Sequence, residues 1–370
     1  MLKIAILLLN NNGDILYATP IAKQIKQYDF PGCHLTWIVA EQCIDILKGN
    51  EYIDKLDVVS LNRINEIYEG KWATIEMLYK SKLNRGEYDK LFILQPFDRN
   101  YLKYKSCIRR MILDSYPYSI NVPLKPLLRL STQEKLNVHA FIKGNEIENY
   151  QNRILYEFAP SSGQANISTE EVLNIAAQIV KMNSSTCVIL SSNQDLEIVD
   201  EHVFSAKSLT FKENSELINY CTLLLGCSSG ISWLSTSDYC KAIPTIQFLN
   251  YKVPWFNSLK FDFKINNISI ENVIELYNFD KEIIVRAVDC FLKYGLARAK
   301  SEFDQELRKE YLLNNFYTIS NYFFQVQDYK RLFIFFINNL KGNIGITKNN
   351  FRFMRLLYRR LIYKCNHNLL

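Results

Sequence analysis

The first side chain that could act in catalysis is the carboxylate of Asp14, which lies soon after the first apolar run of the chain. Ile4–Leu9 is unbroken apolar sequence, and Asn12, Gly13 and Asp14 follow soon after it. Glycine allows a tight turn, and the backbone amides that open the next helix can face a ligand. Asp14 has two interpretations, a structural helix N-cap and a general base that takes the proton from a hydroxyl. Residue type alone does not separate them.

A second loop of small residues follows a later apolar run. After Leu223–Leu225 the order is Gly226, Cys227, Ser228, Ser229 and Gly230, and helical sequence comes next. Such a loop suits a diphosphate, because backbone amides and the helix dipole meet at a helix start. A simple capped turn, with Ser228 or Ser229 as N-cap, explains the same residues. Neither a Walker A loop nor a GxGxxG pattern is present.

Further hydrogen-bonding side chains surround these loops in sequence. Ile154–Ser168 contains Ser161, Ser162 and Gln164, and no lysine follows nearby. Glu213 can bind a ribose hydroxyl pair, and ordinary charge at a helix start explains it as well. By location only, the cations that could face a phosphate are Lys207, Lys212 and Lys241, each of which also fits a solvated surface.

The sequence contains no metal-ligand spacing. The four histidines lie far apart and form neither HxxH nor HExxH, and DxD signals are missing. We therefore expect no metal and no cofactor. The nine cysteines are odd in number and scattered, without a CxxC pair, which predicts reduced thiols in a cytoplasm.

Strands that alternate with helices must position the two loops. In the first half we expect strands at Ile4–Leu9, His34–Val39, Asp57–Ser60 and Leu91–Leu94, with helices at Ile15–Tyr28 and Glu41–Lys48. In the second half we expect strands at Ile154–Phe158, Thr186–Leu190, Leu223–Leu225 and Pro244–Leu249, with a helix at Thr169–Met182. This alternation predicts right-handed crossovers and mostly parallel sheets.

The expected fold class is α/β, with two Rossmann-like domains facing a cleft and a helical, basic C-terminal extension. We place the domains at 1–150, 151–290 and 291–370, since a polar stretch separates the two alternating halves. Ligands of such sheets bind beyond the carboxyl ends of the strands. The interpretation therefore requires Asp14 to face the second loop, and Cys227–Gly230 to reach solvent.

Positive charge is concentrated at the C-terminal end. The net charge is +6, and residues 341–370 hold seven basic and no acidic side chains, so residues 1–340 carry −1. The amphipathic segment 351–364 can bind an anionic membrane surface or pack its apolar face on the body. Its aromatic residues lie on the apolar stripe, so we expect no nucleic-acid partner. The first residues are interpreted as a strand and not a signal peptide, because Asn10 ends the run without a cleavage site.

The opening of the chain, Lys3–Leu56, resembles the bacterial heptosyltransferases of glycosyltransferase family 9. It has a strand, a G-D turn, an apolar helix with an early proline, a second strand ending in W-hydrophobic-V, and an N…ID segment. The donor loop of that family has the form G-x-D-[ST]-G-x-x-H-L. Gly226–Leu234 follows this frame, with Ser228 in place of the aspartate and Trp233 in place of the histidine.

This resemblance implies a GT-B fold and an inverting transfer of a sugar, such as a heptose, from a nucleoside diphosphate donor. The acceptor would be a cell-surface glycan or a lipid-linked molecule, as in lipopolysaccharide biosynthesis, and the enzyme would be cytoplasmic or peripheral on the inner face of the plasma membrane. Asp14 would be the catalytic base, and Asn12 and Gly13 the acceptor-side loop. The donor-binding residues would be Ser161, Ser162, Gln164, Glu213, Ser228, Ser229 and Gly230. A nucleotide-sugar epimerase and a non-catalytic scaffold at a membrane surface remain as alternatives.

Overall fold

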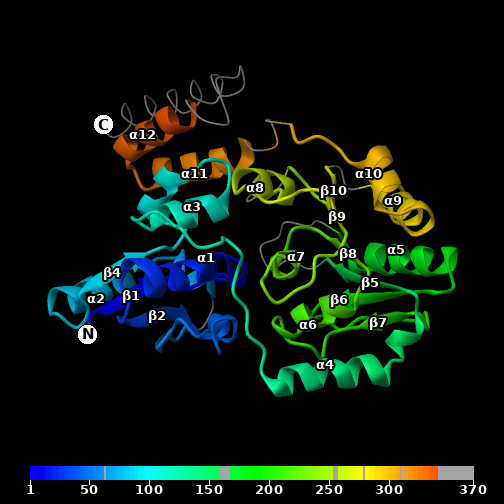
Figure 1. Cartoon of the computed structure of the whole chain (residues 1–370). Coiled ribbons are helices and arrows are strands. Elements are labelled where there is room, and N and C mark those ends of the chain that lie inside the picture. The colour runs from blue at the N-terminus through cyan, green and yellow to red at the C-terminus, as the bar shows by residue number, and fades with distance from the viewer. Residues whose placement is uncertain are drawn as a thin grey trace.

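Two α/β units and a set of C-terminal helices make up the chain in this computed structural model (Figure 1). The structure describes residues 1–61, 64–158, 167–252, 257–277, 280–308, 311 and 313–340. Each unit contains one parallel sheet, of four strands in the first and six in the second. The predicted α/β fold class with two Rossmann-like units is confirmed.

The first sheet has the order β3-β2-β1-β4. Its strands are β1 (Lys3–Leu7), β2 (His34–Ala40), β3 (Lys55–Val59) and β4 (Lys90–Ile93). Its helices are α1 (Asn12–Gln24), continued by a π-helical turn to Asp29, α2 (Lys71–Asn84) and α3 (Ile108–Ser115). β1 lies inside the sheet and is buried on both faces, which explains its unbroken apolar sequence. Glu41–Ile46 forms a 3₁₀ helix where we expected an α-helix.

The second sheet has the order β10-β9-β8-β5-β6-β7. Its strands are β5 (Asn152–Glu157), β6 (Thr186–Ser191), β7 (Val203–Ser205), β8 (Leu223–Gly226), β9 (Thr245–Phe248) and β10 (Val273–Leu276). The helices that follow these strands or cover the sheet are α5 (Thr169–Met182), α6 (Glu213–Tyr220), α7 (Gly230–Leu234), α8 (Leu259–Ile265), α9 (Lys281–Tyr294) and α10 (Leu296–Phe303). The sequence did not predict β7 and β10, which are short and form the two edges of the sheet.

The chain crosses between the units before the boundary that we placed at residue 150. α4 (Thr132–Gly144) packs against α6 and lies beneath the second unit in Figure 1. The segment before α4 runs between the units, where the Leu127 amide donates to Thr19 Oγ1 at 2.8 Å and the Leu128 amide to Asp238 Oδ1 at 3.0 Å. The polar stretch near residue 150 instead connects α4 to β5 within the second unit.

The last described helices return to the first unit. α11 (Leu313–Gln325) and α12 (Tyr329–Leu340) pack Phe316, Phe323 and Phe335 against Tyr101 and Tyr104. The basic segment 351–364 lies outside the described residues. Within the part of the chain that the structure describes, no helix has both the length and the apolar character needed to cross a membrane.

Candidate functional site

Asp14 lies in the first turn of α1, just beyond the carboxyl end of β1. The N-cap of this helix is Asn11, and Asp14 is the third helical residue. The interpretation of Asp14 as the N-cap is therefore wrong. Its carboxylate still helps to close the turn, because Oδ2 accepts a long hydrogen bond of 3.4 Å from the Asn11 amide.

The surroundings of Asp14 favour its neutral form. Burial raises the pKa of Asp14 from 3.8 to about 7, and the hydrogen bond from the Asn11 amide offsets only part of this shift. The residue keeps partial exposure to solvent, so a proton can reach its carboxyl group. A general base works best when its pKa lies near the operating pH. A carboxyl group with a pKa of about 7 meets that condition.

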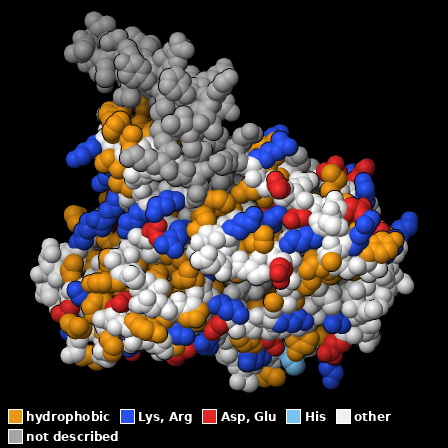
Figure 2. All heavy atoms as spheres, turned by 45° about the horizontal axis from the view of Figure 1, so that its top comes forward, with side chains coloured by type: hydrophobic (Ala, Val, Ile, Leu, Met, Phe, Trp, Pro, Cys, Tyr) orange, Lys and Arg blue, Asp and Glu red, His pale blue; other side chains and the backbone are white. Residues whose placement is uncertain are grey.

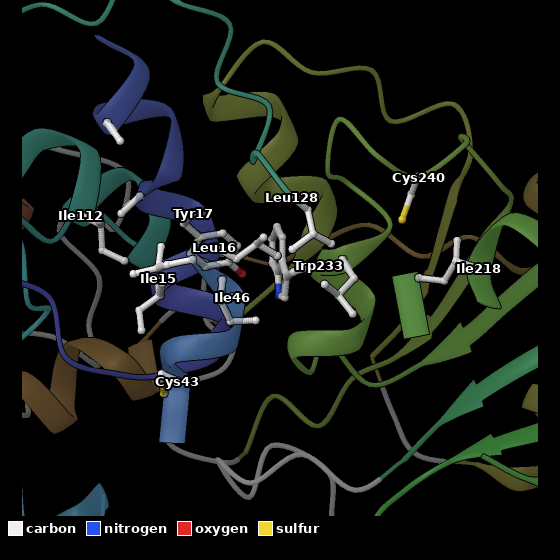
Figure 3. Close-up of a cluster of buried hydrophobic side chains, with 14 of the residues drawn as sticks. Ile15, Leu16, Tyr17, Cys43, Ile46, Ile112, Leu128, Ile218, Trp233 and Cys240 are labelled. Atoms are coloured by element: carbon white, nitrogen blue, oxygen red, sulfur yellow. The ribbon is translucent and has the colours of Figure 1, made fainter. Parts of the chain in front are cut away.

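The two loops singled out in the sequence come together in space. A Cβ placed on Gly13 would lie 3.9 Å from the Cα of Gly230. One turn further along α1, the Tyr17 ring meets the Trp233 ring edge-on, with centroids 4.7 Å apart (Figure 3). The loop that carries Asp14 therefore meets the second loop, as the interpretation requires. The Tyr17 and Trp233 rings are in direct contact at this junction of the two units.

The backbone amides of the bend Cys227–Ser229 donate hydrogen bonds to buried side chains of the protein itself. The amides of Cys227 and Ser229 donate to Glu157 Oε1 at 2.8 and 3.1 Å, and the Ser228 amide donates to Gln247 Oε1 at 2.5 Å. Cys227, Ser228 and Ser229 are only 1%, 3% and 8% exposed. The requirement that Cys227–Gly230 reach solvent therefore fails at Cys227, Ser228 and Ser229. The expectation that these amides face an external diphosphate is corrected as well, because internal acceptors already hold them. Gly230 is the one residue of the expected bend that remains partly exposed.

Glu157 is a residue that sequence analysis missed. It ends β5, which pairs with β8, and it accepts a third hydrogen bond at 2.5 Å from the Ser232 hydroxyl. The bend thus encloses a carboxyl group that the protein itself supplies. A signal was present, because a glutamate at the carboxyl end of an apolar strand must find partners when it is buried.

Replacing Glu157 by alanine is expected to lower the free energy of unfolding by about 3 kcal/mol, because two buried amides and a hydroxyl lose their acceptor. Glu157→Gln keeps one acceptor oxygen, so it should cost about 1 kcal/mol. Urea unfolding of both variants measures the two costs. Equal costs would show that the hydrogen bonds to Glu157 do not hold the bend.

Two buried polar atoms near the contact of the loops lack a hydrogen-bond partner within the described chain. They are Asn12 Oδ1, beside Gly13, and the Ser228 hydroxyl. Ser228 also has a left-handed backbone conformation, with φ of 61°. Because buried polar atoms are normally hydrogen-bonded, these two are the groups that a polar ligand at this junction could engage.

The other residues predicted to bind the sugar donor are not found among the described residues at this junction. Both carboxylate oxygens of Glu213 are used inside the second unit, where they accept from the Asn137 side chain and the Thr210 amide, each at 2.7 Å. Lys207 is paired with Asp195, Lys212 is paired with Glu134, and Lys241 is exposed. Ser161, Ser162 and Gln164 lie outside the described residues.

Neither a metal cluster nor a disulfide occurs among the described residues. No three His, Cys, Asp or Glu side chains gather there in a way that could hold a metal ion. The eight described cysteines are all free and buried. Burial and the nearby Glu157 carboxylate raise the pKa of the Cys227 thiol, so it stays neutral and is a poor nucleophile.

A buried ion pair joins the two units beside Tyr17. Arg109 of α3 donates to Asp262 of α8 at 3.1 Å, and neither side chain is exposed. The Arg109 guanidinium lies 5.7 Å from the centroid of the Tyr17 ring, and the Cys107 thiol donates to the other oxygen of Asp262 at 3.1 Å. This pair fixes one helix of each unit next to α1. Sequence analysis missed it, because no local pattern links residues so far apart.

No family model and no curated protein sequence matches the chain. Solved structures do match it. A glycosyl transferase of family 9 from Veillonella parvula is 13% identical with a TM-score of 0.53, and the match covers 86% of this chain and 94% of that one.

Two E. coli enzymes are similar to the same degree. The ADP-heptose lipopolysaccharide heptosyltransferase II is 12% identical with a TM-score of 0.50, over 80% of this chain and 99% of that one. The heptosyltransferase WaaC, solved with ADP, is 13% identical with a TM-score of 0.50, over 81% and 100%. Likeness at such low identity shows the fold and leaves the activity to be argued from the site. The chain thus has the two-unit GT-B fold of the family 9 glycosyltransferases, and the resemblance seen in its sequence is confirmed at the level of the fold.

Proposed function

We propose that this protein transfers a sugar from a nucleoside diphosphate donor to an acceptor hydroxyl, with inversion at the anomeric carbon. The observation that carries this proposal is Asp14, a carboxyl group with a pKa of about 7 next to the contact between Gly13 and Gly230. Its ionised form would take the hydroxyl proton as the acceptor oxygen bonds to the anomeric carbon. The bond from that carbon to the donor phosphate breaks on the opposite face, and the nucleoside diphosphate leaves.

The donor would bind on the second unit, beyond the carboxyl ends of β5 and β8. Gly230 and the Ser228 hydroxyl, which has no hydrogen-bond partner among the described residues, would meet its diphosphate. Ser161, Ser162 and Gln164 would add further hydrogen bonds to it. Because the bend is closed and the Tyr17 and Trp233 rings are in contact, the units must separate for a diphosphate to reach Ser228. A solved heptosyltransferase with the same fold holds ADP, which supports a nucleoside diphosphate as ligand. We propose no metal and no cofactor for this reaction.

The acceptor would be a glycan or a lipid-linked molecule on the first unit, next to Asn12 and Gly13. A heptose as the sugar rests on the resemblance alone. We also propose that segment 351–364 holds the cytoplasmic enzyme at an anionic membrane, where each Lys or Arg contributes about 1 kcal/mol. α12 exposes Phe333 (68%), Ile334 and Ile337, and these side chains could join that contact. Failure of the full chain to float with phosphatidylglycerol vesicles would remove the membrane from the proposal.

A panel of ADP, UDP, GDP and CDP, with sugars attached, tests the donor by thermal unfolding. A ligand at 100 times its Kd stabilises the folded state by about 2.7 kcal/mol, so we expect one base to raise the Tm by several degrees. Incubation of the matching nucleotide sugar without acceptor should leave the sugar unchanged, whereas an epimerase would alter it. A protein that ignores all four nucleotides would be the non-catalytic scaffold, an outcome that the closed bend at Ser228 would then explain.

A further inference from the structure

A separate pocket lies in the first unit. It has a volume of about 470 Å³, within the range of ~300–1,000 Å³ typical of small-molecule sites. All of its lining residues fall between Leu102 and Leu124, from the end of the 3₁₀ helix Asp98–Lys103 through α3 to the segment that leads to α4. No lining residue belongs to Asn12–Asp14 or to the second unit. The pocket is therefore distinct from the site proposed for sugar transfer.

The lining carries an excess of positive charge. It contains Lys103, Lys105, Arg110 and a single carboxylate, Asp114, which leaves a net charge of +2. One oxygen of Asp114 pairs with Arg110 Nε at 2.7 Å, and the other pairs with Lys105 Nζ at 3.3 Å. Both oxygens are thus engaged, and Lys103 has no hydrogen bond or ion pair with any described residue. Figure 2 shows that Lys and Arg side chains gather on this unit, on the left of the view.

Among the cations that line the pocket, Lys103 is the one that an anionic ligand would stabilise most. Its side chain is partly buried, and the loss of water lowers the pKa of Lys103 despite the raising influence of Asp114. A cation that is withdrawn from water without a bonded partner is unfavourable, and an anionic ligand would remove that cost.

Aromatic and aliphatic side chains form the rest of the pocket. The Tyr116 hydroxyl donates to Asp29 at 2.6 Å, which fixes its ring, and the Tyr118 ring lies 5.5 Å away, centroid to centroid, and is exposed. Leu102, Leu113, Ile120 and Leu124 line the remainder. Such a surface can cover the carbon atoms of a ligand while the cations hold its charged group. A charged group attached to a carbon skeleton fits this pocket better than a free inorganic ion.

We propose that this pocket binds the phosphate group of a phosphate monoester, carried by a saccharide or by a lipid headgroup. A monoester bears about −1.5 to −2 charges at pH 7, which matches the net +2 of the lining. Lys103 supplies the positive charge that no residue neutralises, and Arg110 and Lys105 provide further donors. The inference does not depend on the proposed sugar transfer, because the pocket shares no residue with that site.

Two binding experiments on the full chain test this inference. Calorimetry with glucose 1-phosphate probes a soluble ester, and flotation with vesicles of phosphatidylcholine containing phosphatidic acid probes a lipid headgroup. In at least one of them, Lys103→Gln should weaken binding about ten-fold, as expected for the loss of one charge-assisted hydrogen bond. Lys55→Gln is the matched control, because Lys55 is an exposed lysine of the same unit without an ion pair among the described residues, and it should bind like the wild type.

The outcomes separate the two sources of the phosphate. Binding of glucose 1-phosphate that depends on Lys103 identifies a saccharide phosphate, and dependence seen only with vesicles identifies a lipid headgroup. The proposal is overturned if neither probe binds at millimolar concentration, or if Lys103→Gln and Lys55→Gln lower binding equally. An unchanged Tm for Lys103→Gln establishes that its fold is intact. An unchanged response to the nucleotide panel separates this test from that of sugar transfer.

Discussion

Replacing Asp14 by asparagine is expected to lower the rate of sugar transfer about 10²- to 10⁴-fold, the usual contribution of a general base. The amide has the size of the carboxylate and can still accept the hydrogen bond from the Asn11 amide, but it cannot take a proton. The measurement is the steady-state rate with the nucleotide sugar that the panel identifies. The Kd of the nucleoside diphosphate should stay unchanged, because Asp14 lies on the first unit and the donor would bind on the second.

A surface acid of the same unit provides the matched control for this variant. Asp45 is exposed and pairs only with Lys48 among the described residues, so Asp45→Asn should keep the wild-type rate. An Asp14→Asn protein that transfers sugar at the wild-type rate would remove Asp14 from the mechanism. Loss of nucleotide affinity together with the rate would indicate that Asp14 shapes the junction and does not act as a base.

Replacing Asp262 by alanine is expected to lower the free energy of unfolding by about 3–5 kcal/mol, because it leaves the Arg109 guanidinium buried without its counter-charge. The Cys107 thiol loses its acceptor in the same variant. The loss should be read from urea unfolding as a lower midpoint. The Asp262→Ala replacement should also loosen the packing of α3 on α8, since the Arg109–Asp262 pair links those helices.

A double replacement separates the burial of charge from the contact itself. Arg109→Met combined with Asp262→Leu removes both charges and keeps apolar volume, so it should recover most of the stability that Asp262→Ala loses. If Asp262→Ala costs less than about 1 kcal/mol, the pair is not the buried, partnered contact described here.

Much of the fold could be predicted, because a strand that a parallel sheet buries on both faces is an unbroken apolar run. Ile4–Leu9 and Leu223–Leu225 are such runs, and both form interior strands. The edge strands β7 and β10 escaped prediction because β7 has only three residues and Glu275 interrupts the apolar residues of β10. The position of α4 is a tertiary property, since α4 could pack on either unit until the Asn137 contact to Glu213 is known.

The sequence indicated that Asp14 and Ser228 follow strand ends, but not which hydrogen bonds surround them. Asp14 and the bend at Ser228 both follow apolar strands, so their placement at strand ends followed from the sequence. The pKa of Asp14 arises from tertiary burial, which no local pattern reports. The acceptor that fills the bend, Glu157, lies 70 residues before the Cys227 amide that it holds. Sequence reasoning therefore misses buried residues, such as Glu157, that are distant in sequence and accept the hydrogen bonds of a loop.

The raised pKa of Asp14 also links pH to stability. The folded state prefers the neutral carboxyl, so the contribution of Asp14 to stability is fully present below pH 3.8 and is lost as the pH rises through about 7. Because Asp14 is partly exposed to water, we expect this loss to be about 2 kcal/mol.

The most direct measurement is the ¹³C NMR titration of the Asp14 carboxyl carbon, assigned as the signal that disappears in Asp14→Asn. This experiment needs no substrate and reports the surroundings of the proposed base. We predict a titration midpoint at about pH 7, as expected for a carboxyl desolvated where the two loops meet. A midpoint at about pH 4, the ordinary value for a solvated aspartate, would contradict the account of Asp14 as a base prepared by the contact between the two units.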